Sequence, residues 1–463
     1  MTETDVGRSE GSSHPTAGEG LLSKKRGHHL LNNRWSNWAG NQRCRPIDCL
    51  SVAFESQIVE AVSRARASRV KLKAVGSGHS FTDIACTQGA MLETSGLAGV
   101  IDHSHNPPRA SIAAGTTIEV AAETLWGIGL SFSSLGDIGK QTLAGAIATG
   151  THGTSSIHGS ISSQVRRVRL VDGLGNVREI GPDSHPEMLD AVRVNLGALG
   201  IVTELEFDLE PAYFLETNEW PMPLEEAREN LLELFQSHRH FEFFWFPHTK
   251  VALAKSHDLT SKRPRPASPT KVWFYTVFLG NYFFEALCKV GKIFPPAIPS
   301  INRFIASRET PSRRVAPAHR AFINERRVRF YEMEYAVPAE AAPDLLSRLE
   351  RAIESSGLRI SFPVEVRYSP SESAWLSPAF GRETVWVAIH TYRGVNPRKY
   401  FEIFEALAAE VSGRPHWGKM HFLDARRLAR LYPRWKDFQE VRRMLDPERI
   451  FANRYLEQVL GSE

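Results

Sequence analysis

A glutamate and an arginine two positions apart carry the clearest chemistry in the sequence. Glu365 and Arg367 lie in FPVEVRYS, residues 362–369, whose alternation of residue types predicts a strand. Successive side chains of a strand point to opposite faces, so these two share one face. A carboxylate beside a guanidinium suits a ligand rich in hydroxyl groups, because the pair offers both acceptors and donors. An ordinary ion pair at a sheet surface has the same pattern, and the residues alone favour that simpler explanation.

A lysine in a second short motif could stabilise negative charge. Lys419 ends HWGK, residues 416–419, and a fixed cation in a dry site stabilises an anion that forms during a reaction. A surface lysine with its charge in water is the simpler alternative. His390, inside a predicted strand at 385–391, is interpreted as a hydrogen-bonded core histidine rather than a residue of a pocket.

The sequence predicts no metal site and no disulfide framework. His152, His416 and His421 have no partners at the spacing of metal ligands. No pair of cysteines reads C-x-x-C, so none matches a zinc motif. The four are interpreted as incidental thiols of a reducing compartment: Cys44, Cys49, Cys86 and Cys288.

Four segments of small residues indicate a large ligand in the first half of the chain: residues 76–80, 114–116, 145–154 and 195–200. Gly76 and Gly78 follow a predicted strand, but Phe81 takes the third glycine position of the dinucleotide fingerprint and no amphipathic helix follows. Glycine-rich loops are uncommon in a compact domain unless they serve a site. Their backbone N–H groups can converge on phosphate. A two-phosphate cofactor such as FAD therefore fits better than a small substrate.

Periodicity predicts the elements that would position these residues. Helical spacing of apolar residues predicts helices at 56–68, with Ser56 as N-cap, at 118–126 and at 343–356. Alternation predicts strands at 70–75, 109–114, 165–171, 177–180 and 203–209. In the first of these strands, Lys71 and Lys73 would face away from the apolar side.

Composition excludes several classes of protein. The 463 residues include 42% hydrophobic and 23% charged residues, with 56 Lys and Arg against 52 Asp and Glu. This balance is typical of a globular chain and not of a nucleic-acid-binding one. Residues 1–33, rich in Ser, Gly and charge, are predicted to form a disordered tail. The most apolar stretch, residues 272–284, is too short to cross a bilayer. No secretory signal is visible, so a cytoplasmic location is expected.

Five motifs in this order resemble one known family: VGSGHSF at 75–81, GAIATGTHGT at 145–154, NLGALGIV at 195–202, the Glu-x-Arg of 365–367 and RPHWGK at 414–419. They are similar to motifs of the FAD-linked aldonolactone oxidases and dehydrogenases, within the vanillyl-alcohol-oxidase-type flavoproteins. The likeness is closest to actinobacterial L-gulono-1,4-lactone dehydrogenases. It covers nearly everything from about residue 35 to residue 460.

The resemblance implies an α+β fold of two domains. Residues 34–211 would form an FAD-binding domain of the PCMH type, and residues 212–410 a substrate-binding cap with an antiparallel sheet. The C-terminal segment, residues 411–463, would return to complete the first domain. Within the cap, residues 302–329 hold eight arginines against two glutamates, and they are interpreted as a solvated face rather than a phosphate patch.

The resemblance also implies roles for individual residues. Glu365 and Arg367 would bind the sugar ring, and Lys419 would lie at the N1–C2 edge of the flavin. In many relatives the histidine of the first loop, here His79, is bonded to the flavin 8α-methyl group; in others it only contacts the pyrophosphate. The residues implied to bind FAD are Gly76, Ser77, Gly78, His79, Ser80, Gly115, Thr116, Gly136, Gly145, Thr149, Gly150, His152, Gly153, Gly200, Ile201 and Val202.

The implied activity is oxidation of an aldono-1,4-lactone by hydride transfer from C2 to flavin N5, as in the biosynthesis of ascorbate-type compounds. Two alternatives remain: an FAD-dependent alditol oxidase with the same motifs, and a non-catalytic flavin protein that docks a partner through its Arg-rich stretch. The electron acceptor would be oxygen or a cytochrome or quinone, depending on a small residue within 136–139. A quinone would favour peripheral membrane contact through residues 272–284, although cap core is the favoured place for that stretch.

Overall fold

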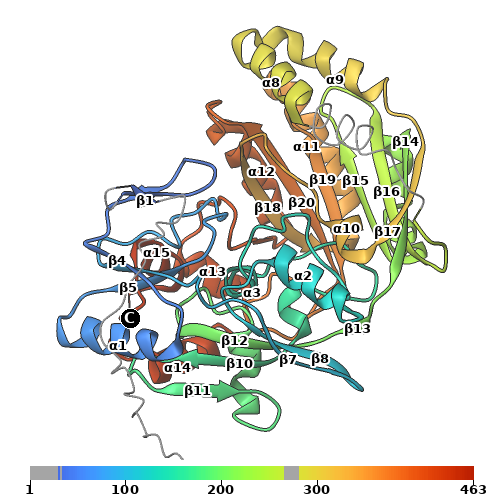
Figure 1. Ribbon diagram of the computed structural model, residues 1–463. Helices are drawn as coiled ribbons and strands as arrows, with labels where there is room; N and C mark the ends of the chain where they lie inside the picture. Colours follow the sequence, from blue (N-terminus) through green and yellow to red (C-terminus); the bar gives the residue numbers. More distant parts are fainter. Residues whose placement is uncertain (1–29, 32–33, 265–280, 463) are drawn as a thin grey trace, which may run out of the picture.

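Figure 1 shows a computed structural model of the chain, which describes residues 30–31, 34–264 and 281–462. An N-terminal unit, up to about residue 211, faces a cap built on one large sheet. This mixed architecture confirms the expected α+β fold class. All of the predicted tail at 1–33 except residues 30 and 31, and most of the apolar stretch 272–284, lie outside the described residues. Leu30 and Leu31 form a strand that pairs with Arg34 and Trp35, so ordered structure begins before Trp35.

The N-terminal unit contains two main sheets. A parallel sheet of order β4-β6-β5 is covered by helix α1 (Glu55–Ala67), and an antiparallel sheet of order β11-β10-β12-β8-β7 lies beside it. The strands are β1 (Leu30–Leu31), β2 (Arg34–Ser36), β3 (Arg43–Cys44), β4 (Asp48–Ser51), β5 (Leu72–Val75), β6 (Ala90–Glu93), β7 (Val100–His105), β8 (Pro108–Ala113), β9 (Leu130–Ser131), β10 (Val165–Val171), β11 (Val177–Ile180), β12 (Ile201–Asp208) and β13 (Glu210–Pro211). The other helices are α2 (Ile118–Gly127), α3 (Leu143–Thr149) and α4 (Leu189–Val192).

The cap contains an antiparallel sheet of order β17-β14-β16-β15-β19-β20-β18-β21. Its strands are β14 (Phe214–Pro223), β15 (His240–Trp245), β16 (Val251–Thr260), β17 (Ser312–Pro317), β18 (Phe330–Pro338), β19 (Val364–Ser369), β20 (Thr384–Tyr392) and β21 (Arg414–Pro415). Its helices are α5 (Leu224–Glu229), α6 (Leu231–Ser237), α8 (Phe284–Ile293), α9 (Ile298–Ala306), α10 (Ala318–Phe322), α11 (Ala342–Ser356) and α12 (Arg398–Glu410).

The two faces of this cap sheet differ in polarity. Val364 and Val366 belong to the apolar face, which packs in one core with helix α11. Strand alternation therefore places Glu365 and Arg367, one residue on, on the opposite face. That face is directed at the N-terminal unit, and its charged side chains are buried.

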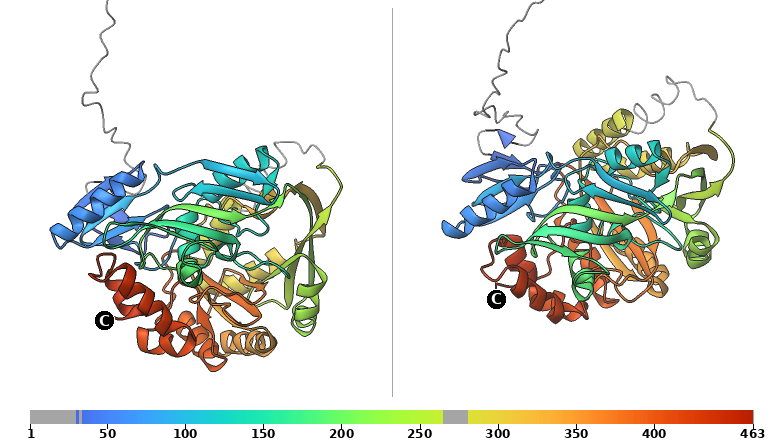
Figure 2. Two further views of the ribbon diagram at one scale, coloured as in Figure 1. Left: turned by 90° about the horizontal axis from the view of Figure 1, so that it is seen from below. Right: turned by 60° about the horizontal axis from the view of Figure 1, so that its bottom comes forward.

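The C-terminal segment returns to the N-terminal unit, and both views of Figure 2 show its red helices beside the blue and green strands. Leu72 N donates to Ile450 O at 2.9 Å, and the Asn453 side chain donates to three carbonyls of residues 83–86. β21, however, pairs with β18, so this segment also ends the cap sheet. The last helices are α13 (Ala425–Leu431), α14 (Trp435–Leu445) and α15 (Arg454–Leu460).

Two local expectations are wrong, and one residue is more buried than its place in a strand indicates. Ser56 does not cap α1; the Gln57 side chain accepts from the backbone N–H groups of residues 53 and 54 instead. Lys73, expected on the face opposite the apolar residues, is only 3% exposed, because the C-terminal segment covers it and its Nζ donates to Phe451 O. The glycine-rich stretch 145–154 is not all loop: α3 begins after Thr142, whose hydroxyl caps it, and ends at Gly150, where φ is +70°.

None of the described helices is both long and apolar enough to cross a membrane.

Candidate functional site

β19 and its neighbours bring a glutamate and an arginine together on the polar face of the cap sheet. Arg367 Nη2 lies 2.5 Å from Glu365 Oε1. Pairing of β15 with β19 places Glu242 beside them, and Arg367 Nε donates to Glu242 Oε2 at 2.8 Å. All three side chains are buried. The surface ion pair that the residues alone favoured is therefore wrong, and the pair belongs to an enclosed site.

Burial and the neighbouring cations shift the pKa values of the carboxylates in this cluster in opposite directions. Burial raises the pKa of Glu242, but Lys255 Nζ at 2.8 Å and Arg367 together hold that pKa well below its usual value. Burial also raises the pKa of Glu365, and Arg367 opposes this only in part. The cluster balances three carboxylates with three cations: Glu242, Glu365 and Asp137 with Lys255, Arg367 and Arg326. Buried charges are tolerated only when each has such a partner.

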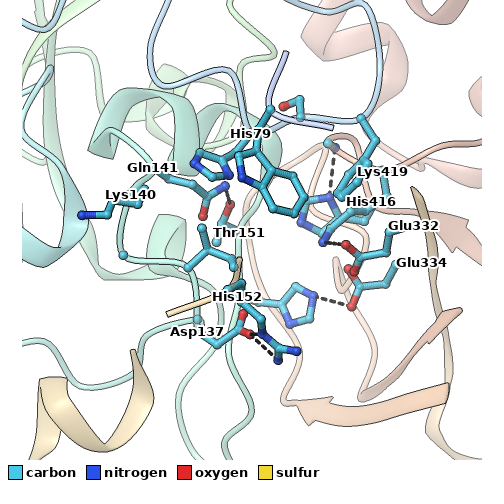
Figure 3. Close-up of a pocket in the computed structure, with 18 of the residues that line it drawn as sticks. His79, Asp137, Lys140, Gln141, Thr151, His152, Glu332, Glu334, His416 and Lys419 are labelled. Carbon is cyan, nitrogen blue, oxygen red and sulfur yellow. Dashed lines mark hydrogen bonds and ion pairs between the residues drawn. The ribbon is translucent and has the colours of Figure 1, made fainter. Parts of the chain in front are cut away.

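Lys419 carries positive charge into the same cavity from the HWGK segment. Its Nζ lies 2.5 Å from Glu332 Oε2 on β18, and Figure 3 shows the two side chains joined. Burial lowers the pKa of Lys419, but Glu332 and Glu334 raise it above its usual value. Burial likewise raises the pKa of Glu332, but Lys419 and His390 bring it down to about 2. The lysine therefore stays charged although it is enclosed.

His390 is both hydrogen-bonded and part of the cavity wall. Its Nδ1 is 3.0 Å from Pro363 O, and its Nε2 is 3.4 Å from Glu332 Oε1. The interpretation as a hydrogen-bonded histidine is confirmed, but its separation from the pocket is wrong.

Two further histidines meet a glutamate at the base of the cavity. His152 Nε2 lies 3.2 Å from Glu334 Oε1, and its ring stacks on Trp386 with centroids 3.6 Å apart. Ligand atoms of His152, Glu334 and His416 lie within 4.8 Å of one another, a convergence that sequence spacing missed. Gly418 N donates to His416 Nδ1 at 2.9 Å, and burial lowers the pKa of His416 to about 3. Each of these three side chains thus has a hydrogen-bond or ion-pair partner, which explains why they lie together.

Glu365, Arg367, Lys419 and the histidines above line one cavity of about 540 Å³ between the cap sheet and the N-terminal unit, whereas Glu242 and Lys255 line a smaller cavity that shares Asp137 and Arg367 with it. Figure 3 shows His79, Gln141 and Thr151 of the N-terminal unit facing Lys419 and Glu332 across the large cavity. Four of the residues that line the large cavity also line a narrower cavity of about 120 Å³: His79, Ser80, Gln141 and Thr149. The large and the narrow cavity together form an elongated site with a wide and a narrow end.

The narrow cavity has the donors that a diphosphate requires. Its wall includes residues 76–80, where Gly78 has φ +67°. The backbone N–H groups of Ser77, Gly78 and Ser80 donate to no atom of the described residues. Such a run of available amides binds anions. The donor set therefore fits the phosphates of a cofactor such as FAD. Other predicted residues of these walls are Gly136, Gly145, Gly200, Ile201 and Val202.

His79 lies where the two cavities meet, with its ring stacked on Trp38 at 5.6 Å between centroids. This position suits either a bond to the flavin ring or a contact with its phosphates.

Four predicted cofactor residues line neither of these two cavities: Gly115, Thr116, Gly150 and Gly153. Gly115 is needed for packing, because a Cβ there would lie 1.9 Å from Thr94 O. Thr116 Oγ1 donates to Ala113 O at 2.6 Å and accepts from Gly99 N, which holds a turn.

Sequence reasoning missed five charged residues of the site: Asp137, Glu242, Arg326, Glu332 and Glu334. Glu332 and Glu334 lie two apart in FYEMEYAVP, residues 330–338, so the alternation that identified Glu365 could have identified them. All eight arginines of the Arg-rich stretch are exposed, as its interpretation as a solvated face expected, but Arg326 Nη2 also lies 2.6 Å from Asp137 in the cavity wall. Burial raises the pKa of that aspartate, but Arg326 and Arg367 lower it to about 2.

Known proteins are similar to this chain in sequence and in fold. The chain is 35% identical over 431 residues to the L-gulono-1,4-lactone dehydrogenase of Mycobacterium tuberculosis, covering 92% of this chain and 99% of that protein. It is 30% identical over 443 residues to the L-gulonolactone oxidase of Bos taurus, covering 93% and 99%. A solved cholesterol oxidase from B. sterolicum matches with a TM-score of 0.76 over 93% of this chain and 97% of that chain, at 16% identity. That likeness shows the vanillyl-alcohol-oxidase-type fold.

Two family descriptions match in sequence order. The FAD-binding domain matches residues 50–181, which hold the loop with His79. The family described as D-arabinono-1,4-lactone oxidase matches residues 205–459, which hold Glu365, Arg367 and Lys419. As the five motifs predicted, this chain belongs to the FAD-dependent aldonolactone oxidase and dehydrogenase family.

Proposed function

We propose that the protein oxidises an aldono-1,4-lactone of the L-gulono-1,4-lactone type. The observation that carries this proposal is the meeting of Glu365, Arg367 and Lys419 in one cavity that continues past His79 to the loop of residues 76–80. The relatives named L-gulono-1,4-lactone dehydrogenase and L-gulonolactone oxidase support the substrate class. Bound FAD would supply the acceptor for the hydride that leaves C2 of the lactone, and the proton of the C2 hydroxyl would pass to a nearby base or to water.

The charged residues have separate tasks in this scheme. Arg367, fixed by Glu242 on one side, offers its remaining N–H groups to the oxygens of a sugar ring. Glu365 receives a hydroxyl hydrogen bond and sets the orientation of the ring, and orientation supplies much of an enzyme's rate. Lys419 keeps its charge beside Glu332 and stabilises negative charge that develops at its end of the cavity.

Anaerobic mixing of the holoenzyme with candidate substrates tests the proposal. L-Gulono-1,4-lactone should bleach the visible absorbance of the flavin, and xylitol should not. Bleaching by xylitol alone would instead support an alditol oxidase, and bleaching by neither would support a non-catalytic flavin protein.

Glu365→Gln should slow the bleaching by roughly 100-fold with flavin content unchanged, because misplacement of the reacting atoms has effects of that size. Arg167→Lys is the matched control: Arg167 pairs with Glu204 and Glu206 on the N-terminal sheet, outside the cavity, so the rate should not change.

The covalent link between His79 and the flavin is part of the proposal. Denatured wild-type protein on a gel should fluoresce under ultraviolet light, and His79→Ala should not. A dark wild-type band would leave the noncovalent contact as the role of this residue. Reoxidation of the reduced enzyme by oxygen, compared with a cytochrome or a quinone, distinguishes an oxidase from a dehydrogenase.

A further inference from the structure

A buried lysine lies in the wall of the narrow cavity and takes no part in the proposed oxidation. Lys73 belongs to β5, which leads directly into the loop of residues 76–80, and it lines the cavity of about 120 Å³. Only 3% of this residue is exposed. Among the described residues that form this wall, Lys73 is the only lysine, arginine, aspartate or glutamate. The charge of a ligand in this cavity must therefore be compensated by Lys73 or by backbone dipoles.

The amine of Lys73 has a donor available for such a ligand. An ammonium group carries three N–H donors. Two of them point to backbone carbonyls at long distances, with Nζ 3.2 Å from Gly197 O and 3.3 Å from Phe451 O. Within the described part of the chain the third donor has no acceptor, and no carboxylate lies within ion-pairing distance of Nζ. A buried cation is costly without a counter-charge, so this position favours an anion that the chain itself does not provide.

The charged residues around this amine do not hold its proton firmly. Burial, with a smaller contribution from Arg442, lowers the pKa of Lys73 to about 7, and Asp446 opposes this only in part. Asp446 already accepts from the backbone N–H groups of residues 450 and 451. Lys71, on the same face of the chain, is exposed, and its Nζ donates to Arg449 O at 2.7 Å. An anionic ligand near Lys73 would raise its pKa and keep the amine protonated.

We propose that Lys73 is a cofactor-binding residue whose ammonium group compensates the charge of the FAD diphosphate in the narrow cavity. The available backbone N–H groups of Ser77, Gly78 and Ser80 supply only partial charges, whereas each phosphate of FAD carries a full negative charge. Lys73 supplies a full positive charge, and the attraction is stronger in this buried wall than it would be in water. The proposal concerns the cofactor alone and does not depend on which sugar the protein oxidises.

Release of FAD from the His79→Ala holoenzyme tests this role. In this background the flavin is noncovalent whatever its linkage in the wild type, and the rise in FAD fluorescence on dilution measures Kd. Lys73→Met should weaken FAD binding by about tenfold or more, as expected when one partner of a buried charge pair is removed. Lys73→Arg retains the positive charge and should bind FAD more tightly than Lys73→Met.

The pH dependence of Kd distinguishes a counter-ion from a structural lysine. Binding of the diphosphate favours the protonated amine, so the affinity should be highest below pH 7. Above pH 7 the amine must take up a proton when FAD binds, and the affinity should fall by up to about tenfold per pH unit. Neither methionine nor arginine titrates in this range, so both variants should lose this dependence.

Lys71→Met is the matched control. Lys71 lies two residues earlier in the chain and also donates to a carbonyl of the C-terminal segment, but it lines neither the large nor the narrow cavity. Its replacement should therefore leave both Kd and its pH dependence unchanged. Unchanged FAD affinity in Lys73→Met, an equal loss in Lys71→Met, a Kd that does not change with pH while Lys73 is present, or a pH dependence that persists in Lys73→Met would each overturn the proposal.

Discussion

Replacing Glu242 by glutamine tests whether charge balance stabilises the buried cluster of the cap sheet. Its carboxylate lies 2.8 Å from both Lys255 Nζ and Arg367 Nε, and the side chain is 6% exposed. An amide of the same shape turns N–H donors toward one of these cations and leaves one buried positive charge without a counter-charge. Removal of one partner from a buried ion pair costs about 3–5 kcal/mol. That is a large part of the 5–15 kcal/mol by which folded domains are typically stable.

Thermal unfolding followed by circular dichroism measures the effect. We expect Glu242→Gln to lower Tm by roughly 5 °C or more, since 1 kcal/mol shifts Tm by about 2–4 °C in domains of 150–250 residues. The double variant Glu242→Gln/Lys255→Met restores the balance of charges and should recover at least half of the loss. A double variant no more stable than the single one would refute charge balance as the cause.

Glu216→Gln is the matched control for this prediction. Glu216 also pairs with a lysine and an arginine, Lys262 and Arg313, but these partners are 58% and 59% exposed at the edge of the same sheet. Exposed pairs contribute up to about 1 kcal/mol, so its Tm should change little. An equal fall in both variants would mean that burial does not decide the cost.

Three further predictions concern other parts of the molecule. Lys419→Met should slow flavin reduction by the lactone at least tenfold with flavin content unchanged; an unchanged stopped-flow rate would remove this lysine from the chemistry. Stability should fall as pH drops below about 6.5, because burial lowers the pKa of three histidines, to about 3, 3 and 4: His240, His416 and His421. Between those values and pH 6.5 the unfolded chain binds more protons than the folded one, so each histidine lowers the free energy of unfolding by up to about 1.4 kcal/mol per pH unit of acidification. Tm should therefore decline between about pH 7 and pH 4, and less steeply in His421→Gln. A Tm that does not change with pH would contradict this assignment. Gly115→Ala should strongly destabilise the fold, because the new Cβ would clash with Thr94 O. In the control Gly127→Ala the new Cβ has no neighbour within 4 Å, so Tm should not change. Equal Tm values in the two variants would exclude the close contact at Gly115.

Local periodicity predicts helices and strands that have one face in the core and the other in solvent. Strands β10 and β11 coincide with their predicted ranges, and α2 is one residue longer than predicted. Periodicity fails where burial is complete or comes from distant chain. α3 is built from small residues because it is packed among other segments, so its composition resembles that of a loop. Lys73 alternates like a solvated lysine, yet Phe451, which accepts from its Nζ, lies 378 residues away in sequence.

The site illustrates why strand alternation predicts which residues share a face but not whether that face contacts solvent or another part of the protein. Polar residues at every second position usually indicate a solvent-facing side, yet Glu332, Glu334 and Glu365 are each 6% exposed or less, because the N-terminal unit covers the polar face of the cap sheet. Alternation was therefore sufficient to pair Glu365 with Arg367. The residues that fix their charges could not be found in this way, since Glu242 lies 125 residues from Arg367 and only the strand order β15-β19-β20-β18 joins them. Long-range pairing, rather than any local motif, thus determines the electrostatics of this site.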